Sequence, residues 1–319
     1  MQKPTVVVTR CQDYERKKVG EGLQRHFELN GGLEKFVSRG DSVLIKPNFI
    51  APRSASHATQ THPAVIIELA KLLKDLGAKP FVGDSPAWSN VHTCARKLRL
   101  TEVLKKMDVP IKELNRARKC RIGNTKVGIS SAALDADVII NLPKFKTHQQ
   151  LVATFAVKNM FGVVSGKRKA ICHFTKGKVE ADFCGLLIDI YKFMKPAITI
   201  IDGIYAMDGG GPIRGRTRPL GWLISGTEPI AIERVCCRLI NIEPESIPII
   251  RTAKEKGFGV LGLDEVNILG DDFPEKICYD FSIPKLIPIR FSFLHVCRSI
   301  TKQIGLLIKA KAGTDRGDK

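Results

Sequence analysis

The sequence has no long apolar run. No uninterrupted hydrophobic stretch among its 319 residues approaches the roughly 18 residues that a membrane-spanning helix needs. The first residues, MQKPTVVVTR, also lack the apolar core and the small-residue cleavage site of a secretory signal peptide. Hydrophobic residues make up 44% of the chain and charged residues 26%, as in ordinary globular proteins. We therefore expect a cytoplasmic protein.

Closely spaced cysteines are also absent. The nine cysteines form no C-x-x-C pair, so the sequence patterns of a zinc ribbon and of a ferredoxin-type cluster are both missing. Their odd number argues against a closed framework of disulfides. The adjacent Cys236 and Cys237 lie in an apolar run, IAIERVCCRLI, where we expect buried thiols. We expect no iron–sulfur cluster in this chain.

Acidic residues are missing from one region. None occurs between Asp137 and Glu180, yet Lys144, Lys146 and His148 follow one another at steps of two in NLPKFKTHQ, after an apolar run. The whole chain has a net charge of +19, which favours an anionic partner. The basic residues are spread along the sequence, without a zinc-finger or aromatic RNA-binding motif. A small anionic metabolite is the expected ligand, and RNA bound to a dispersed basic surface is the alternative.

Short apolar runs alternate with longer stretches of helical periodicity. This alternation predicts an α/β domain over residues 1–284, with a mostly parallel sheet flanked by helices. The clearest helix is expected over 62–76, where Pro63 stands near the first turn, Gly77 marks the exit and His62 can cap the start. The other expected helices are 91–106 and 229–240, and the expected strands are 5–10, 42–46, 78–86, 136–143, 197–202 and 220–226.

Polar or charged side chains follow four of these strands. Because parallel strands end at the same edge of a sheet, where α/β folds bind ligands, we expect these side chains to converge. Polar residues also follow strands simply because strand ends reach the surface. The prediction therefore depends on finding polar or charged residues after four strands and not after one. The residues are Lys46, Asn48, Asp84, Ser85, Lys144, Lys146, His148 and Asp202.

This set suits an enzyme that acts on an anionic substrate, although it does not specify the reaction. Lys144 or Lys146 would bind phosphate or carboxylate, or act as a base where neighbouring cations lower its pKa. His148 would transfer protons near neutral pH. Asp84 and Asp202 would share a divalent metal, since such ions prefer oxygen ligands. Lys46, Asn48 and Ser85 are assigned to ligand binding.

Two further segments extend the expected site. Lys158 and Asn159 are candidate ligand-binding residues, and GVVSGKR, over 162–168, looks superficially like a phosphate-binding loop. It has one residue too few between its glycines, and Arg168 stands where Ser or Thr is required. The second segment, 202–219, is expected to be a mobile loop whose backbone N–H and guanidinium groups contact an anion, with a plain surface turn as the alternative. Its candidate residues are Gly209, Gly210, Gly211 and Arg214.

Six segments together resemble the family known only as domain of unknown function 362. They are VLIKPNF, THPAVI, VGDSP, INLPKFKTH, KNMFG and DGIYAMDGGGP, and they extend over 43–231. The resemblance implies an architecture and positions for the site more than a reaction. Several members of that family carry an added ferredoxin-like module with four-cysteine runs. This chain lacks such a run, so iron–sulfur chemistry is not expected to carry over.

The tail, 285–319, has the pattern of a basic amphipathic helix. From Phe291 onward, apolar residues recur at steps of three and four, with lysines and arginines between them. Such a helix lies on an anionic membrane surface, docks a protein partner or packs on its own domain. Peripheral membrane association is therefore a second expectation for location. The apolar residues are Leu294, Cys297, Ile300, Ile304, Leu307 and Ile308.

Overall fold

One large sheet forms the centre of the molecule in the computed structural model, which describes residues 2–166, 168–272, 278 and 280–290. Eight of the sheet's ten described strands, in spatial order, are β12 (Asn267–Gly270), β1 (Thr5–Arg10), β11 (Arg214–Gly226), β10 (Ile198–Gly210), β7 (Val138–Leu142), β2 (Ser42–Pro47), β3 (Lys79–Asp84) and β4 (Ile111–Glu113). The run from β10 to β4 is parallel, and β11 is antiparallel to both of its neighbours. The predicted α/β class with a mostly parallel sheet is confirmed.

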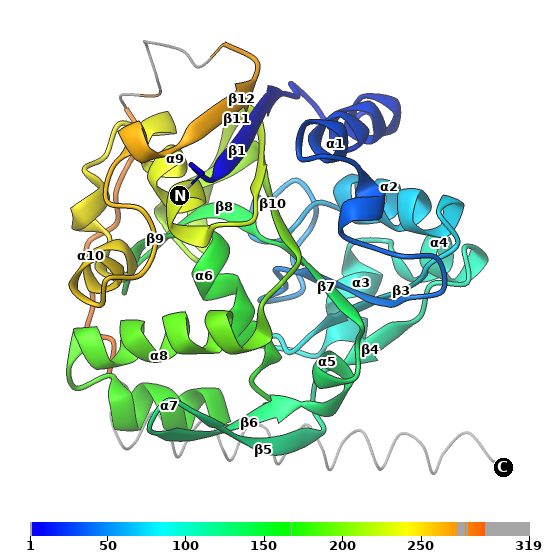
Figure 1. The fold of residues 1–319 in the computed structure, drawn as a ribbon. Helices are drawn as coiled ribbons and strands as arrows, with labels where there is room; N and C mark the ends of the chain where they lie inside the picture. The colour runs from blue at the N-terminus through cyan, green and yellow to red at the C-terminus, as the bar shows by residue number, and fades with distance from the viewer. Residues whose placement is uncertain (1, 167, 273–277, 279, 291–319) are drawn as a thin grey trace, which may run out of the picture.

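Helices cover both faces of this sheet (Figure 1). On one face lie α1 (Arg16–Leu29), α2 (Pro63–Asp75), α3 (Val91–Lys97) and α4 (Thr101–Lys106). On the other lie α6 (Ala156–Asn159), α7 (Arg168–Lys176), α8 (Glu180–Met194), α9 (Pro229–Leu239) and α10 (Pro248–Glu255). Short α5 (Ser131–Leu134) follows a two-stranded ribbon of β5 (Ala117–Ile122) and β6 (Thr125–Ser130).

Alternating side chains of the central strands enter two separate cores. In β2, Val43 and Ile45 pack in the core that contains α1 and α2, whereas Leu44 packs in the core that contains α8 and α9. Because every second residue of a strand points to the same face, Lys46 follows Leu44 toward the side of α6 and α8. Strand geometry therefore turns this lysine inward, where it is 0% exposed.

Three predicted segments differ from the structure. The helix expected over 91–106 is broken between α3 and α4, where Arg99 adopts a positive φ of 57°. The chain beyond Pro143 forms strand β8 (Lys144–His148), which pairs with β10 and with β9 (Val152–Thr154). The strand expected to end at Asp202 continues to Gly210 and pairs with β11, so 202–219 is a long hairpin and not a mobile loop.

Two local predictions are confirmed. His62 caps α2, since its Nδ1 accepts a hydrogen bond from the amide N–H of Ala64 at 3.2 Å, and Pro63 is the first residue of the helix. Cys236 and Cys237 are both 0% exposed within α9.

The predicted tail helix falls outside the described residues from 291 onward and stays a prediction, while 285–290 forms no helix. No helix in the described part of the chain is long and apolar enough to cross a membrane.

Candidate functional site

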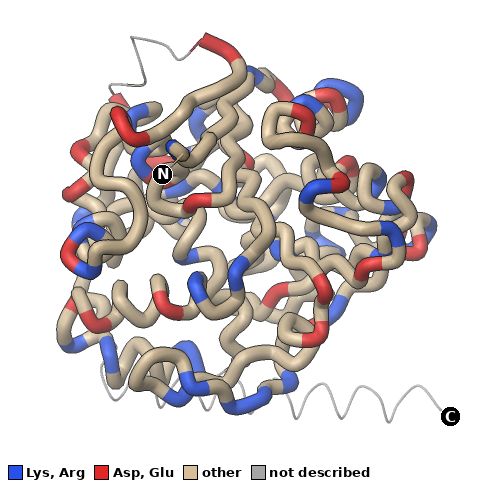
Figure 2. Tube along the Cα trace, viewed as in Figure 1, with Lys and Arg blue, Asp and Glu red and all other residues tan. Residues whose placement is uncertain are grey.

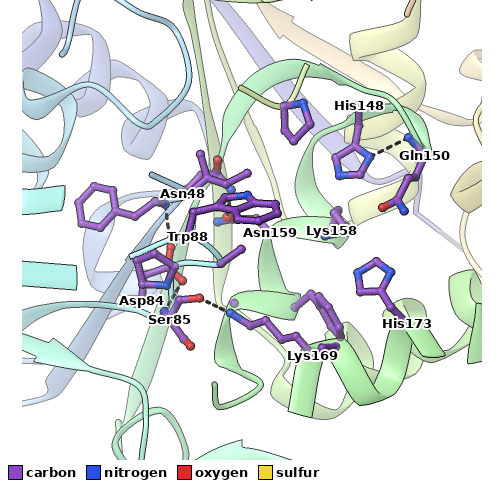
Figure 3. A pocket seen from close by; sticks show the side chains of 18 of the residues that line it. Asn48, Asp84, Ser85, Trp88, His148, Gln150, Lys158, Asn159, Lys169 and His173 are labelled. Carbon is purple, nitrogen blue, oxygen red and sulfur yellow. Dashed lines mark hydrogen bonds between the residues drawn. The ribbon is translucent and has the colours of Figure 1, made fainter. Parts of the chain in front are cut away.

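A cavity of about 350 Å³ lies where β2 and β3 end, against α6 and α7. In Figure 3, Asn48, Asp84 and Trp88 lie on one side of it, and His148 and Lys158 lie on the other. A second cavity of about 50 Å³ adjoins it and shares six lining residues. Of the predicted residues, Lys46, Asn48, Asp84, Ser85, His148, Lys158 and Asn159 line the larger cavity, and Lys144 and Lys146 line the smaller one. Asp202 lines neither of them.

Lys46 forms a buried ion pair with Asp84. The lysine Nζ lies 2.9 Å from Oδ1 of the aspartate, and both side chains are at most 2% exposed. The carboxylate also accepts hydrogen bonds from the amide groups of Phe49 and Ser85, each at 2.7 Å. Burial lowers the pKa of Lys46, and the adjacent aspartate opposes that shift. This partner comes from β3, the neighbouring strand of the sheet.

Lys144 forms a second buried ion pair, with Asp202 at 2.9 Å. The hydroxyl of Tyr14 accepts a hydrogen bond from Lys144 at 2.7 Å and donates one to Asp202 at 2.7 Å. Burial raises the pKa of Tyr14 well above its usual value, so the hydroxyl keeps the proton that it donates. The ring of Tyr14 stacks on that of His62 at a centroid distance of 3.5 Å. We call this pair and the Lys46–Asp84 pair the buried ion pairs.

The buried ion pairs argue against a metal shared by Asp84 and Asp202. Each carboxylate has its own lysine and two further donors, because Asp202 also accepts a hydrogen bond from the amide of His62 at 2.9 Å. Both oxygens of each carboxylate are therefore in use. Within the described residues, no group of three or more His, Cys, Asp and Glu side chains is placed to hold a metal ion.

Lys146 lies two residues beyond Lys144 on the same face of β8, as the spacing of two requires. Its amino group donates hydrogen bonds to Oδ1 of Asn48 and, at 2.8 Å, to the carbonyl oxygen of Thr59. No acidic side chain of the described residues forms an ion pair with it. Burial, together with the charge of Lys158, lowers the pKa of Lys146 to about 7.

Lys158 of α6 and Lys169 of α7 reach the larger cavity from its other wall. Lys158 lies over the ring of Phe161, 5.0 Å from its centroid, and Lys169 donates to the carbonyl oxygen of Ser85. Burial and the charge of Lys46 lower the pKa of Lys158 to about 8, and burial lowers that of Lys169 to about 7. Neither has an acidic partner among the described residues. We call these two and Lys146 the unpaired lysines.

His148 has an environment that does not suit the predicted proton transfer near neutral pH. Burial, and then the charges of Lys158 and Lys146, hold its pKa well below the usual value. Its Nδ1 accepts a hydrogen bond from the amide of Gln150 at 3.1 Å, so the neutral ring carries its proton on Nε2 (Figure 3). His148 is therefore a neutral hydrogen-bond donor in the cavity wall.

Three asparagines form a directional hydrogen-bond chain that ends at Lys146. Asn141 donates to the carbonyl oxygen of Ala156 at 2.9 Å, and its Oδ1 accepts from Asn159 at 2.8 Å. Oδ1 of Asn159 accepts from Nδ2 of Asn48 at 2.9 Å. The amide oxygen of Asn48 is then left to face the amino group of Lys146. The chain fixes which atom of each amide is donor and which is acceptor.

Glycines 209–211 do not offer their amides to the cavity. The N–H of Gly209 donates to the carbonyl oxygen of Ser282, and that of Gly211 donates to the carbonyl oxygen of Gly209, both at 2.7 Å. Gly210 pairs with Arg214 in the hairpin ladder, and Arg214 is exposed and lines neither cavity. The glycines instead allow the hairpin to approach β8 closely, and only Pro212 of the turn reaches both cavities.

Several residues in or beside the cavities carry little or no sequence signal. Tyr14 is a single tyrosine shortly after β1, and Trp88 stands alone in the loop between β3 and α3. Lys169 and His173 are four residues apart on α7, which places them on one helix face, and that spacing was a usable signal. Trp88 is 50% exposed at the cavity, where an aromatic ring is available to a ligand.

Comparison with known proteins shows the family to which this α/β chain belongs. The profile of the family described as "Domain of unknown function (DUF362)" matches residues 43–238, more than half of the chain, and the chain belongs to this family, as its sequence predicted. "Thylakoid-associated protein sll1697" from Synechocystis sp. (strain ATCC 27184 / PCC 6803 / Kazusa) is 34% identical over 302 residues, which cover 93% of this chain and 94% of that protein. Among solved structures, the lactate racemase apoprotein from Thermoanaerobacterium thermosaccharolyticum is similar with a TM-score of 0.44 and 12% identity, over 68% of this chain and 54% of that one.

Proposed function

We propose that this protein binds a small phosphate- or carboxylate-bearing metabolite in the larger cavity and acts on it as an enzyme. The observation that supports this proposal is the excess of positive charge around the two cavities. Five lysines line them, and only two have an acidic partner among the described residues. Charges in a partly buried site interact more strongly than charges in water, so an anion would compensate those unpaired lysines that carry a proton.

The walls also indicate what else the ligand contains. Phe49, Ile50 and Phe161 line the cavity together with Trp88, so apolar surface faces the basic groups. The volume of about 350 Å³ is within the range of small-molecule sites, which combine apolar walls with a few placed polar groups. We propose an anion with an apolar or ring-shaped body.

RNA binding is less well supported. Lys and Arg positions are scattered over helices on both sides of the sheet and do not form one stripe (Figure 2). The unpaired lysines line two adjoining cavities and do not form a track along the surface. A dispersed surface gives weak binding that falls steeply with salt, and such binding would persist after the cavity lysines are replaced.

Tryptophan fluorescence tests the proposal directly. The chain has two tryptophans; Trp88 lies at the cavity and Trp222 is 5% exposed, so a Trp88→Phe variant identifies the source of any signal. Titration with inorganic phosphate and a panel of phosphorylated and carboxylated metabolites should give saturable changes. Lys158→Met should weaken the best ligand by about 10- to 100-fold, since a hydrogen bond to a charged group contributes about 1.5–3 kcal/mol. The matched control is Lys71→Met, which removes an exposed lysine of α2.

Equal effects of the two lysine variants would contradict the cavity proposal. If the same variants bind single-stranded RNA as tightly as the wild type, in a strongly salt-dependent way, the RNA alternative is supported instead.

For location, we propose a cytoplasmic protein whose tail, 285–319, associates with an anionic membrane surface. The tail is basic and amphipathic in sequence, and the similar cyanobacterial protein is named for its association with thylakoids. Basic residues are attracted to anionic lipid headgroups. The full chain should sediment with vesicles that contain anionic lipid, and a chain ending at Arg290 should not. Equal sedimentation of both chains would contradict this, and a tail that binds only a protein in pull-down experiments would indicate a docking role.

A further inference from the structure

Two neutral acceptors hold the amino group of Lys146. The lysine is 3% exposed, and it donates to the amide oxygen of Asn48 and to the carbonyl oxygen of Thr59. Asn48 is not free to present its NH₂ group instead, because that group donates to Asn159 at 2.9 Å. The asparagine chain therefore fixes an amide oxygen, and not an NH₂ group, beside the amino group of Lys146.

The number of acceptors matches a neutral amine. A primary amine has two N–H hydrogens and one lone pair, whereas an ammonium group has three N–H hydrogens and no lone pair. Asn48 and Thr59 use both hydrogens of the amine, which leaves the lone pair of Lys146 unused beside the smaller cavity. A third hydrogen would enter a space lined by Lys144 and Lys158, which is unfavourable for an added positive charge.

Lys144 supplies a fixed neighbouring cation. It lies on the same face of β8, and Asp202 and Tyr14 hold its amino group at 2.9 Å and 2.7 Å. A lysine that is buried next to another cation loses its proton more readily, and this is a known way to make an amine nucleophilic. The contrast within one strand is therefore between a charged lysine at 144 and an amine at 146.

We propose that Lys146 forms a Schiff base with a carbonyl group of the bound anion. The Nζ lone pair attacks the carbonyl carbon, the carbonyl oxygen takes up the proton that the nitrogen releases, and the carbinolamine loses water. Amine and carbonyl compound thus give an imine and water, and no oxidant or reductant is consumed. This inference rests on the proposed anion site and specifies its substrate class as small phosphate- or carboxylate-bearing aldehydes and ketones.

The test uses pyridoxal 5′-phosphate, which carries both an aldehyde and a phosphate. Sodium borohydride reduces an imine to a stable secondary amine, and mass spectrometry of peptides locates it. We expect the adduct mainly on Lys146, protected by excess inorganic phosphate. It should be absent from Lys146→Arg, because a guanidinium group stays protonated and is not a nucleophilic amine. An adduct confined to Lys158, Lys169 or surface lysines would overturn the inference.

A separate readout distinguishes this inference from the proposed function. Inorganic phosphate has no carbonyl group, so its effect on Trp88 fluorescence measures anion binding alone. Saturable phosphate binding without an adduct on Lys146 contradicts the Schiff base and leaves the anion site in place. Absence of both contradicts both proposals. Circular dichroism of Lys146→Arg establishes that the variant is folded.

Asn48→Asp tests the role of the neutral acceptor. This near-isosteric change places a carboxylate against the amino group of Lys146, which favours the ammonium form. We expect adduct formation at pH 7 to slow by about tenfold or more, since one unit of pKa corresponds to tenfold in the amine fraction, and to recover at higher pH. Asn90→Asp, at the start of α3, adds the same charge away from the cavities. A rate–pH profile for Asn48→Asp that matches the wild type would contradict this role.

Discussion

The lysines of the buried ion pairs and the unpaired lysines line the same two adjoining cavities, but their charges are compensated differently. Burial lowers the pKa of the lysine in all five cases. In the ion pairs, a carboxylate from a neighbouring strand compensates the charge, and the lysine is held in place by the protein itself. The unpaired lysines lack that compensation, so their charge is available to a ligand or is given up as a proton. The paired lysines therefore help to hold the shape of the cavity walls, and the unpaired lysines can attract an anion.

The largest expected effect comes from breaking an ion pair. Asp202→Asn leaves Lys144 charged and buried, and removal of one partner of a buried pair typically costs about 3–5 kcal/mol. Urea unfolding should show this loss. Lys71→Met, on the exposed face of α2, should change stability by less than about 0.5 kcal/mol. A similarly small loss for Asp202→Asn would mean that the pair is not needed to hold the site.

A smaller loss is expected from crowding the other ion pair. A Cβ at Gly162 would lie 2.4 Å from Nζ of Lys46 and 2.5 Å from Oδ1 of Asp84, so Gly162→Ala must displace them. Overpacking of this kind costs about 1–3 kcal/mol. At Gly166 a Cβ would meet nothing within 4 Å, and its φ of +51° is one that asparagine tolerates, so Gly166→Asn is the control. Equal unfolding free energies for the two variants would contradict the close contact of Gly162 with Lys46 and Asp84.

The pH dependence of stability should reveal the lowered pKa of Lys146. The pKa of Lys146 is about 7 in the folded chain and 10.5 in an unperturbed lysine. Between these values the unfolded chain binds a proton that the folded chain does not, so stability rises with pH, by up to about 1.4 kcal/mol per unit. The difference in unfolding free energy between wild type and Lys146→Met should therefore change in favour of wild type from pH 7 to pH 9. A constant difference would show that this pKa is not lowered.

The sequence predicted the parts of the site that follow from local periodicity. Lys46, Asn48, Asp84 and Ser85 come together because β2 and β3 are parallel neighbours, and parallel strands end at one edge. The steps of two between Lys144, Lys146 and His148 match a strand, and the structure places these three residues on one face of β8.

Long-range pairing is what the sequence did not predict. β8 exists because β10 and β9 hydrogen-bond to it, and local periodicity contains no information on those partners. For the same reason, the acidic partners of Lys46 and Lys144 were not foreseen, and the lysines looked unneutralised. The glycine-rich segment has the composition of a loop, because glycine is rare inside strands. In the fold, it gives the close approach to Thr147 of β8, where a Cβ on Gly211 would lie 2.1 Å from the carbonyl oxygen.

The central claim is that the positive charge of Lys158 and Lys169, which have no acidic partner among the described residues, is kept for a bound anion. Its most direct test is the free energy of unfolding, with and without inorganic phosphate, of wild type and of the double variant Lys158→Met, Lys169→Met. Without phosphate, the double variant should be at least as stable as wild type, because two partly buried charges that lack a carboxylate partner are removed. Phosphate at ten times its dissociation constant should stabilise wild type by about 1.4 kcal/mol and leave the double variant nearly unchanged. A double variant that is less stable than wild type and responds equally to phosphate would contradict the account.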